Sequence, residues 1–114
     1  MVGFDDRLTR EDAIDTLMSF EGEEIEVLMR YHFEELNSFG DFDSEEYSFQ
    51  ASFELSLMME QMGGKGIILQ NLREGIDINI SRARELTYYS LLDGGVKVVA
   101  HFSSHAIELD VRPV

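Results

Sequence analysis

The chain has 114 residues, of which 44% are hydrophobic and 11% aromatic, enough for one buried core but not for a second. It contains no cysteine, which excludes a disulfide scaffold, a zinc ribbon and a cysteine nucleophile. The formal net charge of −14, from 23 acidic and 9 basic residues, argues against direct binding of nucleic acid, because that requires a basic surface. We therefore expect a single folded domain over residues 1–114.

We expect no targeting signal in the N-terminal residues. They lack the basic start and the apolar stretch of a signal peptide, and Val2 stands where N-myristoylation requires glycine. No uninterrupted apolar run approaches the roughly 20 residues that a membrane span needs. We expect a cytoplasmic protein without a membrane partner.

The first predicted element is a helix from about residue 10 to residue 21. Thr9 is a suitable N-cap, and Asp12 follows it at the spacing of a capping box. Gly22 is a typical helix end. The apolar residues that share one face at helical spacing are Ala13, Ile14, Leu17 and Met18.

Residues 23–37 fit two patterns. The residues that alternate as in a strand are Ile25, Val27, Met29, Tyr31 and Phe33. Those that form a helical stripe are Ile25, Leu28, Met29, His32, Phe33 and Leu36. The β-branched and aromatic content favours a strand, and a helix is the alternative.

Residues 47–57 show the most regular strand pattern, because apolar side chains alternate there with mostly small polar ones. One apolar and one polar face indicate an antiparallel sheet with one side open to solvent. Residues 76–80 repeat the alternation over a shorter stretch.

The last third of the chain predicts a hairpin and a final strand. Residues 85–92 and 96–102 flank an Asp-Gly-Gly sequence, which suits a tight turn, and residues 106–111 alternate again. A helix over residues 82–92, with Ser81 as cap and Gly94 as end, is the alternative. The pattern as a whole predicts an α+β fold, with a mostly antiparallel sheet of four to six strands and an N-terminal helix packed on one face.

The charge is unevenly distributed along the chain. Residues 1–46 hold fifteen acidic and three basic residues, whereas residues 47–114 hold eight acidic and six basic residues. Like charges gathered on one surface repel one another, and a cationic partner would relieve that repulsion and associate faster. Nucleases and other nucleic-acid-binding proteins are basic and therefore complementary to such a surface.

These observations predict a small acidic binding protein that neutralises a basic macromolecule. It would act as an inhibitor, in the manner of an immunity protein for a nuclease toxin or of a nucleic-acid mimic. The carboxylates expected at the contact are Glu23, Glu24, Glu26, Glu34, Glu35, Asp41, Asp43, Glu45 and Glu46. Phe39 and Phe42 lie among them and are candidate apolar anchors. No cofactor is implied.

Two other classes of function fit parts of the sequence. His101 and His105, joined by Glu108 or Asp110, would suit a small metal-assisted enzyme if a bend brought both imidazoles together. Alternatively, the alternating strands could form a homodimer or bind a small ligand, and the acidic surface would then serve only solubility or a saline host.

Overall fold

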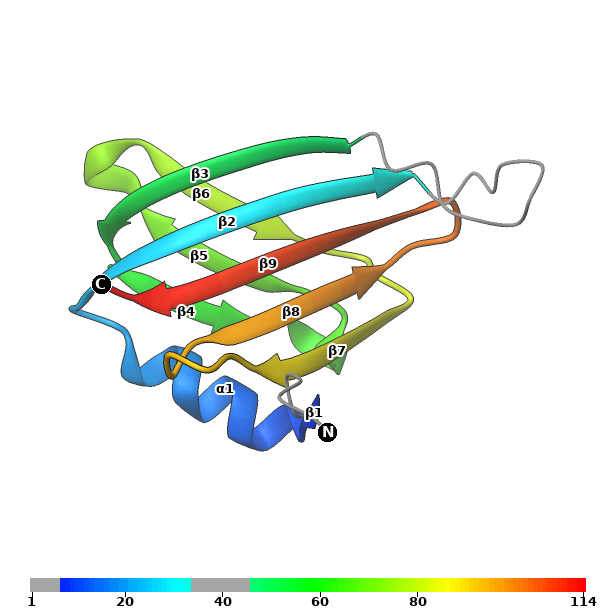
Figure 1. Cartoon of the computed structure of the whole chain (residues 1–114), viewed down its shortest axis with the longest axis horizontal. Coiled ribbons are helices and arrows are strands. Elements are labelled where there is room, and N and C mark those ends of the chain that lie inside the picture. Colours follow the sequence, from blue (N-terminus) through cyan, green and yellow to red (C-terminus); the bar gives the residue numbers. More distant parts are fainter. Residues whose placement is uncertain (1–6, 34–45) are drawn as a thin grey trace.

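The computed structural model describes residues 7–33 and 46–114, and these form two antiparallel sheets and one short α-helix (Figure 1). In chain order, the elements are β1 (Arg7–Leu8), α1 (Arg10–Ser19), β2 (Glu24–Phe33), β3 (Glu46–Glu54), β4 (Leu57–Glu60), η1 (Met62–Gly64), β5 (Ile67–Asn71), η2 (Leu72–Glu74), β6 (Ile76–Ile80), β7 (Glu85–Ser90), β8 (Val96–His101) and β9 (His105–Pro113).

The two sheets lie one behind the other. The larger has the strand order β1-β7-β8-β9-β2-β3, and the smaller has the order β4-β5-β6. In Figure 1 the smaller sheet lies behind the larger one, and α1 lies along their lower edge. The helix contacts β4 of one sheet and β7 and β8 of the other, so it closes one side of the space between them.

The core fills the space between the sheets, because the strands of both sheets turn rows of apolar side chains into it. The fully buried larger side chains are Leu17 from α1, Ile25, Val27, Phe53, Val96, Val98, Leu109 and Val111 from the larger sheet, Met58, Ile67 and Leu69 from the smaller sheet, and Leu55 between β3 and β4. The opposite side of the larger sheet, which we call the outer face, carries the polar residues that alternate with them.

The predicted N-terminal helix is confirmed. The Thr9 side chain accepts a hydrogen bond from the Asp12 backbone N–H at 3.2 Å, as an N-cap does. The helix ends at Ser19, two residues earlier than expected. Its buried face is also narrower than predicted, because Met18 is 46% exposed.

The strand predictions are confirmed, with changed ends. Residues 24–33 form β2, so the helical alternative there is wrong; residues 76–80 form β6, and the final strand is β9. The hairpin of β7 and β8 is present, and Gly94 adopts a φ of +88° in its turn. The helix considered for residues 82–92 is wrong, because Glu85–Ser90 pairs as a strand with β8.

The predicted architecture holds only in outline. The described residues are richer in sheet than an arrangement of four to six strands under one helix, because β4 and β5 join β6 in a second sheet. The strand predicted over residues 47–57 ends at Glu54, and Leu57 begins β4. The described part of the chain contains no helix that is long and apolar enough to span a membrane.

Candidate partner-binding surface

Most of the predicted contact residues lie outside the described residues. These are Glu34, Glu35, Phe39, Asp41, Phe42, Asp43 and Glu45. Glu46 begins β3, but only its backbone is described. The structure therefore places the side chains of three predicted contact residues, which are Glu23, Glu24 and Glu26.

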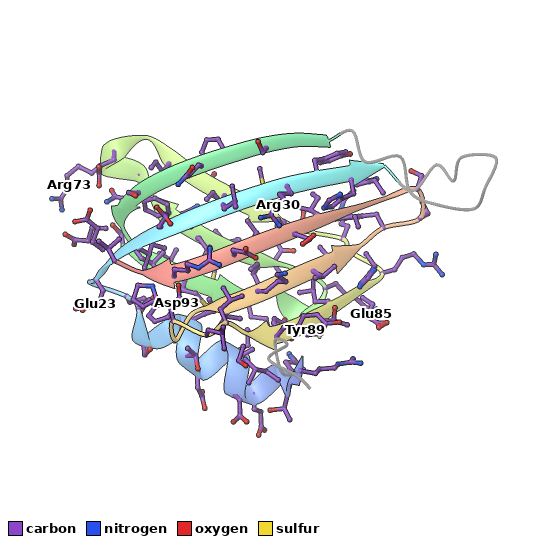
Figure 2. The ribbon with its side chains drawn as sticks, in the orientation of Figure 1. Glu23, Arg30, Arg73, Glu85, Tyr89 and Asp93 are labelled. Carbon is purple, nitrogen blue, oxygen red and sulfur yellow. The ribbon has the colours of Figure 1, made fainter. Side chains whose placement is uncertain are left out.

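Those three residues lie at one end of the larger sheet, together with a fourth carboxylate that the sequence did not single out. Glu24 of β2 stands directly opposite Glu54 of β3, and both are exposed. Glu23 precedes β2 and is exposed, and Figure 2 shows it at this end of the molecule. Glu26 follows on the outer face, where its carboxylate accepts a hydrogen bond from Gln50 Nε2 at 3.1 Å. We call Glu23, Glu24, Glu26 and Glu54 the acidic end.

The register makes the acidic end electrostatically unfavourable on its own. Like charges directly opposite each other on neighbouring strands repel, and Glu24 and Glu54 are such a pair. Among residues 7–33 and 46–114, no ion pair involves any member of the acidic end. Arg73, Arg82 and Arg84 also form no ion pair with it within those ranges. Arg112 of β9 stands directly opposite Glu26, but it forms its ion pairs with Asp93 and Asp110, so the repulsion between Glu24 and Glu54 is not relieved by an ion pair among the described residues.

Two arginines of the opening stretch are paired with carboxylates from later in the chain. Arg10 binds Glu60, with Nη2 donating to Oε1 at 2.7 Å, and this hydrogen bond raises the pKa of Arg10. Arg30 Nη1 lies 3.7 Å from Glu108 Oε1. Among the described residues, these two bases therefore form their ion pairs with carboxylates of the second part of the chain and not with those of the opening stretch.

Glu108 is the centre of a charge cluster in the middle of the outer face. Its Oε2 lies 3.0 Å from His32 Nε2, and its Oε1 lies 3.7 Å from Arg30 Nη1 and 3.8 Å from Lys97 Nζ. The four residues come from three adjacent strands, β2, β9 and β8. Opposite charges thus meet at the centre of this face, in contrast to the acidic end.

Asp110 lies beside this cluster and is buried, with 4% of its surface exposed. Its Oδ2 is 3.7 Å from Arg112 Nη1, while its Oδ1 has no hydrogen-bond partner in the described part of the chain. Arg112 in turn pairs with Asp93 in the β7–β8 turn, where Nε and Oδ2 are 2.8 Å apart. Arg112 is therefore shared between two carboxylates of the second part of the chain.

The structure separates the two histidines of the proposed metal site. His101 pairs with Ala106, so His105, which directly precedes Ala106 in β9, points to the opposite face of the sheet. His101 Nε2 lies 3.3 Å from Thr87 Oγ1, whereas the His105 ring stacks on Tyr31 and Phe102. The described residues also contain no group of three or more His, Cys, Asp or Glu placed to hold a metal ion. The geometry argues against a metal ion shared by these histidines.

A surface cavity of about 400 Å³ lies where β1 and the start of α1 meet β7. Arg7, Arg10 and Tyr88 are among its lining residues. The Tyr88 hydroxyl is buried and without a hydrogen-bond partner among the described residues, and burial is the main cause that raises the pKa of Tyr88 to about 12. None of the predicted contact residues lines this cavity.

Searches with protein-family models, against curated proteins and against solved structures find no match for this chain.

Proposed function

We propose that the protein binds a basic protein through its acidic end and blocks the surface that this partner uses for nucleic acid. The observation that carries the proposal is the pair of Glu24 and Glu54, which stand opposite each other on β2 and β3 and form no ion pair among the described residues. Lys or Arg side chains of a partner would convert this repulsion into attraction.

The partner class follows from the same electrostatics. A protein that binds nucleic acid presents Lys and Arg along the path of the phosphates. Carboxylates on a rigid sheet can occupy that path, because the register fixes the relative positions of Glu24, Glu26 and Glu54. A nuclease toxin or another nucleic-acid-binding protein is therefore the partner we propose, and binding would exclude its nucleic acid.

The test compares two charge reversals of equal size at different places. Glu24→Lys with Glu54→Lys alters the acidic end, while Glu11→Lys with Asp15→Lys makes the same change on the exposed side of α1. Each variant is immobilised at low salt and exposed to host lysate, and the retained proteins are identified by mass spectrometry. Circular dichroism checks that both variants fold.

We expect a basic nucleic-acid-binding protein to be retained by the wild type and by the α1 variant, and lost from the Glu24/Glu54 variant. The purified partner should then lose its nucleic-acid binding when the wild-type chain is added. Equal loss from both variants would show that net charge alone governs retention, and equal retention would show that the acidic end has no part in it.

A further inference from the structure

β3 is the terminal strand of the larger sheet and is paired on one side. All nine of its residues, from Glu46 to Glu54, are in continuous register with β2, and the described residues include no strand on its other side. The strand contains no proline or lysine, the residues that commonly protect such edges from pairing. It therefore presents a long, regular edge.

The ladder shows which backbone groups face that edge. The Leu55 N–H donates to the Glu23 carbonyl at 2.9 Å, and the Val114 N–H donates to the Glu24 carbonyl at 3.1 Å. Bonding alternates along an antiparallel strand, so odd-numbered residues of β2 bond to β3 and even-numbered residues bond to β9. The N–H and C=O groups of Ser48, Gln50 and Ser52 consequently point away from β2.

The side chains along this edge leave it accessible. Ser48, Gln50 and Ser52 are exposed on the outer face, and Phe49 on the inner side is 44% exposed opposite Met29. At the end of the strand the Glu54 carbonyl already accepts a hydrogen bond from Asn71 Nδ2 at 2.8 Å. The available stretch is therefore centred on Gln50, with an apolar contact offered by Phe49.

Charge disfavours a second copy of the chain at this edge. An antiparallel pair of β3 strands that overlaps over all nine residues would place Glu54 of each chain opposite Glu46 of the other. Like charges opposite each other destabilise a pair, and Glu24 lies on the next strand beside Glu54. A partner strand that places Lys or Arg near Glu54 would instead be attracted to it.

We infer that an extended, lysine- or arginine-bearing segment of the partner adds to the larger sheet as an antiparallel strand beside β3. This inference rests on the proposed function and specifies how the partner is held. Main-chain hydrogen bonds to Ser48, Gln50 and Ser52 provide the pairing, and alternate side chains of the segment provide specificity. A cation meets Glu54 and Glu24, and an apolar side chain covers Phe49.

The probe is a nine-residue peptide, capped at both ends, in which lysine alternates with valine. A peptide of the same composition with its lysines clustered, and one with glutamate in place of lysine, serve as controls. Binding is measured by titration calorimetry. Amide hydrogen exchange, followed by NMR, reports which backbone N–H groups become protected.

Ser52→Pro is the decisive variant, because it removes an N–H that faces the edge and leaves the bonds between β2 and β3 intact. Ser52→Ala is the matched control, since it removes the hydroxyl and keeps the N–H. We expect Ser52→Pro to weaken binding of the alternating peptide about tenfold or more, and Ser52→Ala to leave it nearly unchanged. Ser48→Pro is the second variant if Ser52→Pro does not fold.

In the wild type, the amides of Ser48, Gln50 and Ser52 should exchange more slowly when the alternating peptide is bound. The inference would be overturned if the alternating peptide did not bind. It would also be overturned if the peptide bound without protecting these amides and Ser52→Pro did not weaken its binding. A dimer of the free protein that Ser52→Pro dissociates would also overturn it, because the occupant would then be a second copy. The proposed function fails separately, when the Glu24/Glu54 reversal leaves partner retention unchanged.

Discussion

His32 Nε2 lies 3.0 Å from Glu108 Oε2, and this contact joins β2 to β9 in the centre of the outer face. Arg30 and Lys97 approach the other carboxylate oxygen of Glu108, so one acidic side chain is shared by three others. The central strands of the larger sheet are thus linked by side chains as well as by the backbone ladder.

Glu108→Gln should lower the free energy of unfolding by about 1 kcal/mol, because it leaves Arg30 and Lys97 without the carboxylate that they share. Urea unfolding at low salt measures the change, and added salt should reduce it. Glu85→Gln is the matched control, since Glu85 is exposed on the same face and forms no ion pair among the described residues. A loss of equal size in both variants would contradict the role given to Glu108.

Phe53→Ala should destabilise the fold by about 3–5 kcal/mol, because it opens a cavity between the two sheets where Phe53 is 2% exposed. Phe49 lies four residues earlier on the same side of β3, is 44% exposed and provides the control. We expect Phe49→Ala to cost less than about 1 kcal/mol. Thermal or urea unfolding of the two variants checks the difference, and similar losses would mean that the core lies elsewhere.

Gly66→Ala should strongly destabilise the smaller sheet, because a Cβ there would clash with the Ile80 carbonyl oxygen. The backbone of β5 and β6 would have to separate, at a cost of about 2 kcal/mol or more. Gly75→Ala is the comparison: it has open space around the new Cβ but a φ of +76°, so it should cost about 1 kcal/mol. Unfolding midpoints that rank the two variants in the reverse order would contradict this packing.

The Tyr88 hydroxyl gives the fold an alkaline pH dependence. Its pKa is about 12 in the folded chain, above the ordinary value of 10.0, because burial disfavours the phenolate and the charge of Glu60 adds to the effect. Between pH 10 and 12 the unfolded chain releases this proton and the folded chain keeps it, so stability falls as the pH rises. Below pH 10 the Tyr88 hydroxyl stays protonated in both states and does not change how stability depends on pH.

Tyr88→Phe should therefore show a shallower loss of stability above pH 10 than the wild type. At neutral pH the variant should be as stable or up to about 1 kcal/mol more stable, because the hydroxyl that it loses has no partner among the described residues. Urea unfolding at a series of pH values measures both effects. Parallel pH profiles would contradict the raised pKa.

Alternating strands and the capped helix could be predicted from sequence, because their signals are local. Thr9 at the start of α1 and the alternation around Phe53 each depend on a few neighbouring residues. The alternation does not predict β4 and β5, because both contain short, continuous apolar runs, residues 57–59 and 67–69, which show no period. The helical alternative for residues 82–92 failed because strand pairing with β8 outweighed local capping signals.

The candidate site was predictable only in part. The charge count pointed to Glu23, Glu24 and Glu26, since they belong to the acidic opening stretch. Glu54 was not singled out, because its position opposite Glu24 depends on a register between β2 and β3 that charge composition does not reveal. The pairing of Arg10 with Glu60, fifty residues away, likewise depends on the fold rather than on local sequence.

The placement of β9 has a consequence for synthesis on the ribosome. β9 follows every other strand in chain order, yet it lies between β8 and β2 in the larger sheet. At roughly 5–20 residues per second, β2 and β3 are therefore translated about 3–12 s before β9, the other neighbour of β2. During that interval the edge of β2 that later pairs with β9, which includes Ile25, lacks its partner strand. A nascent chain stalled before residue 105 should therefore bind chaperones that recognise exposed apolar strands.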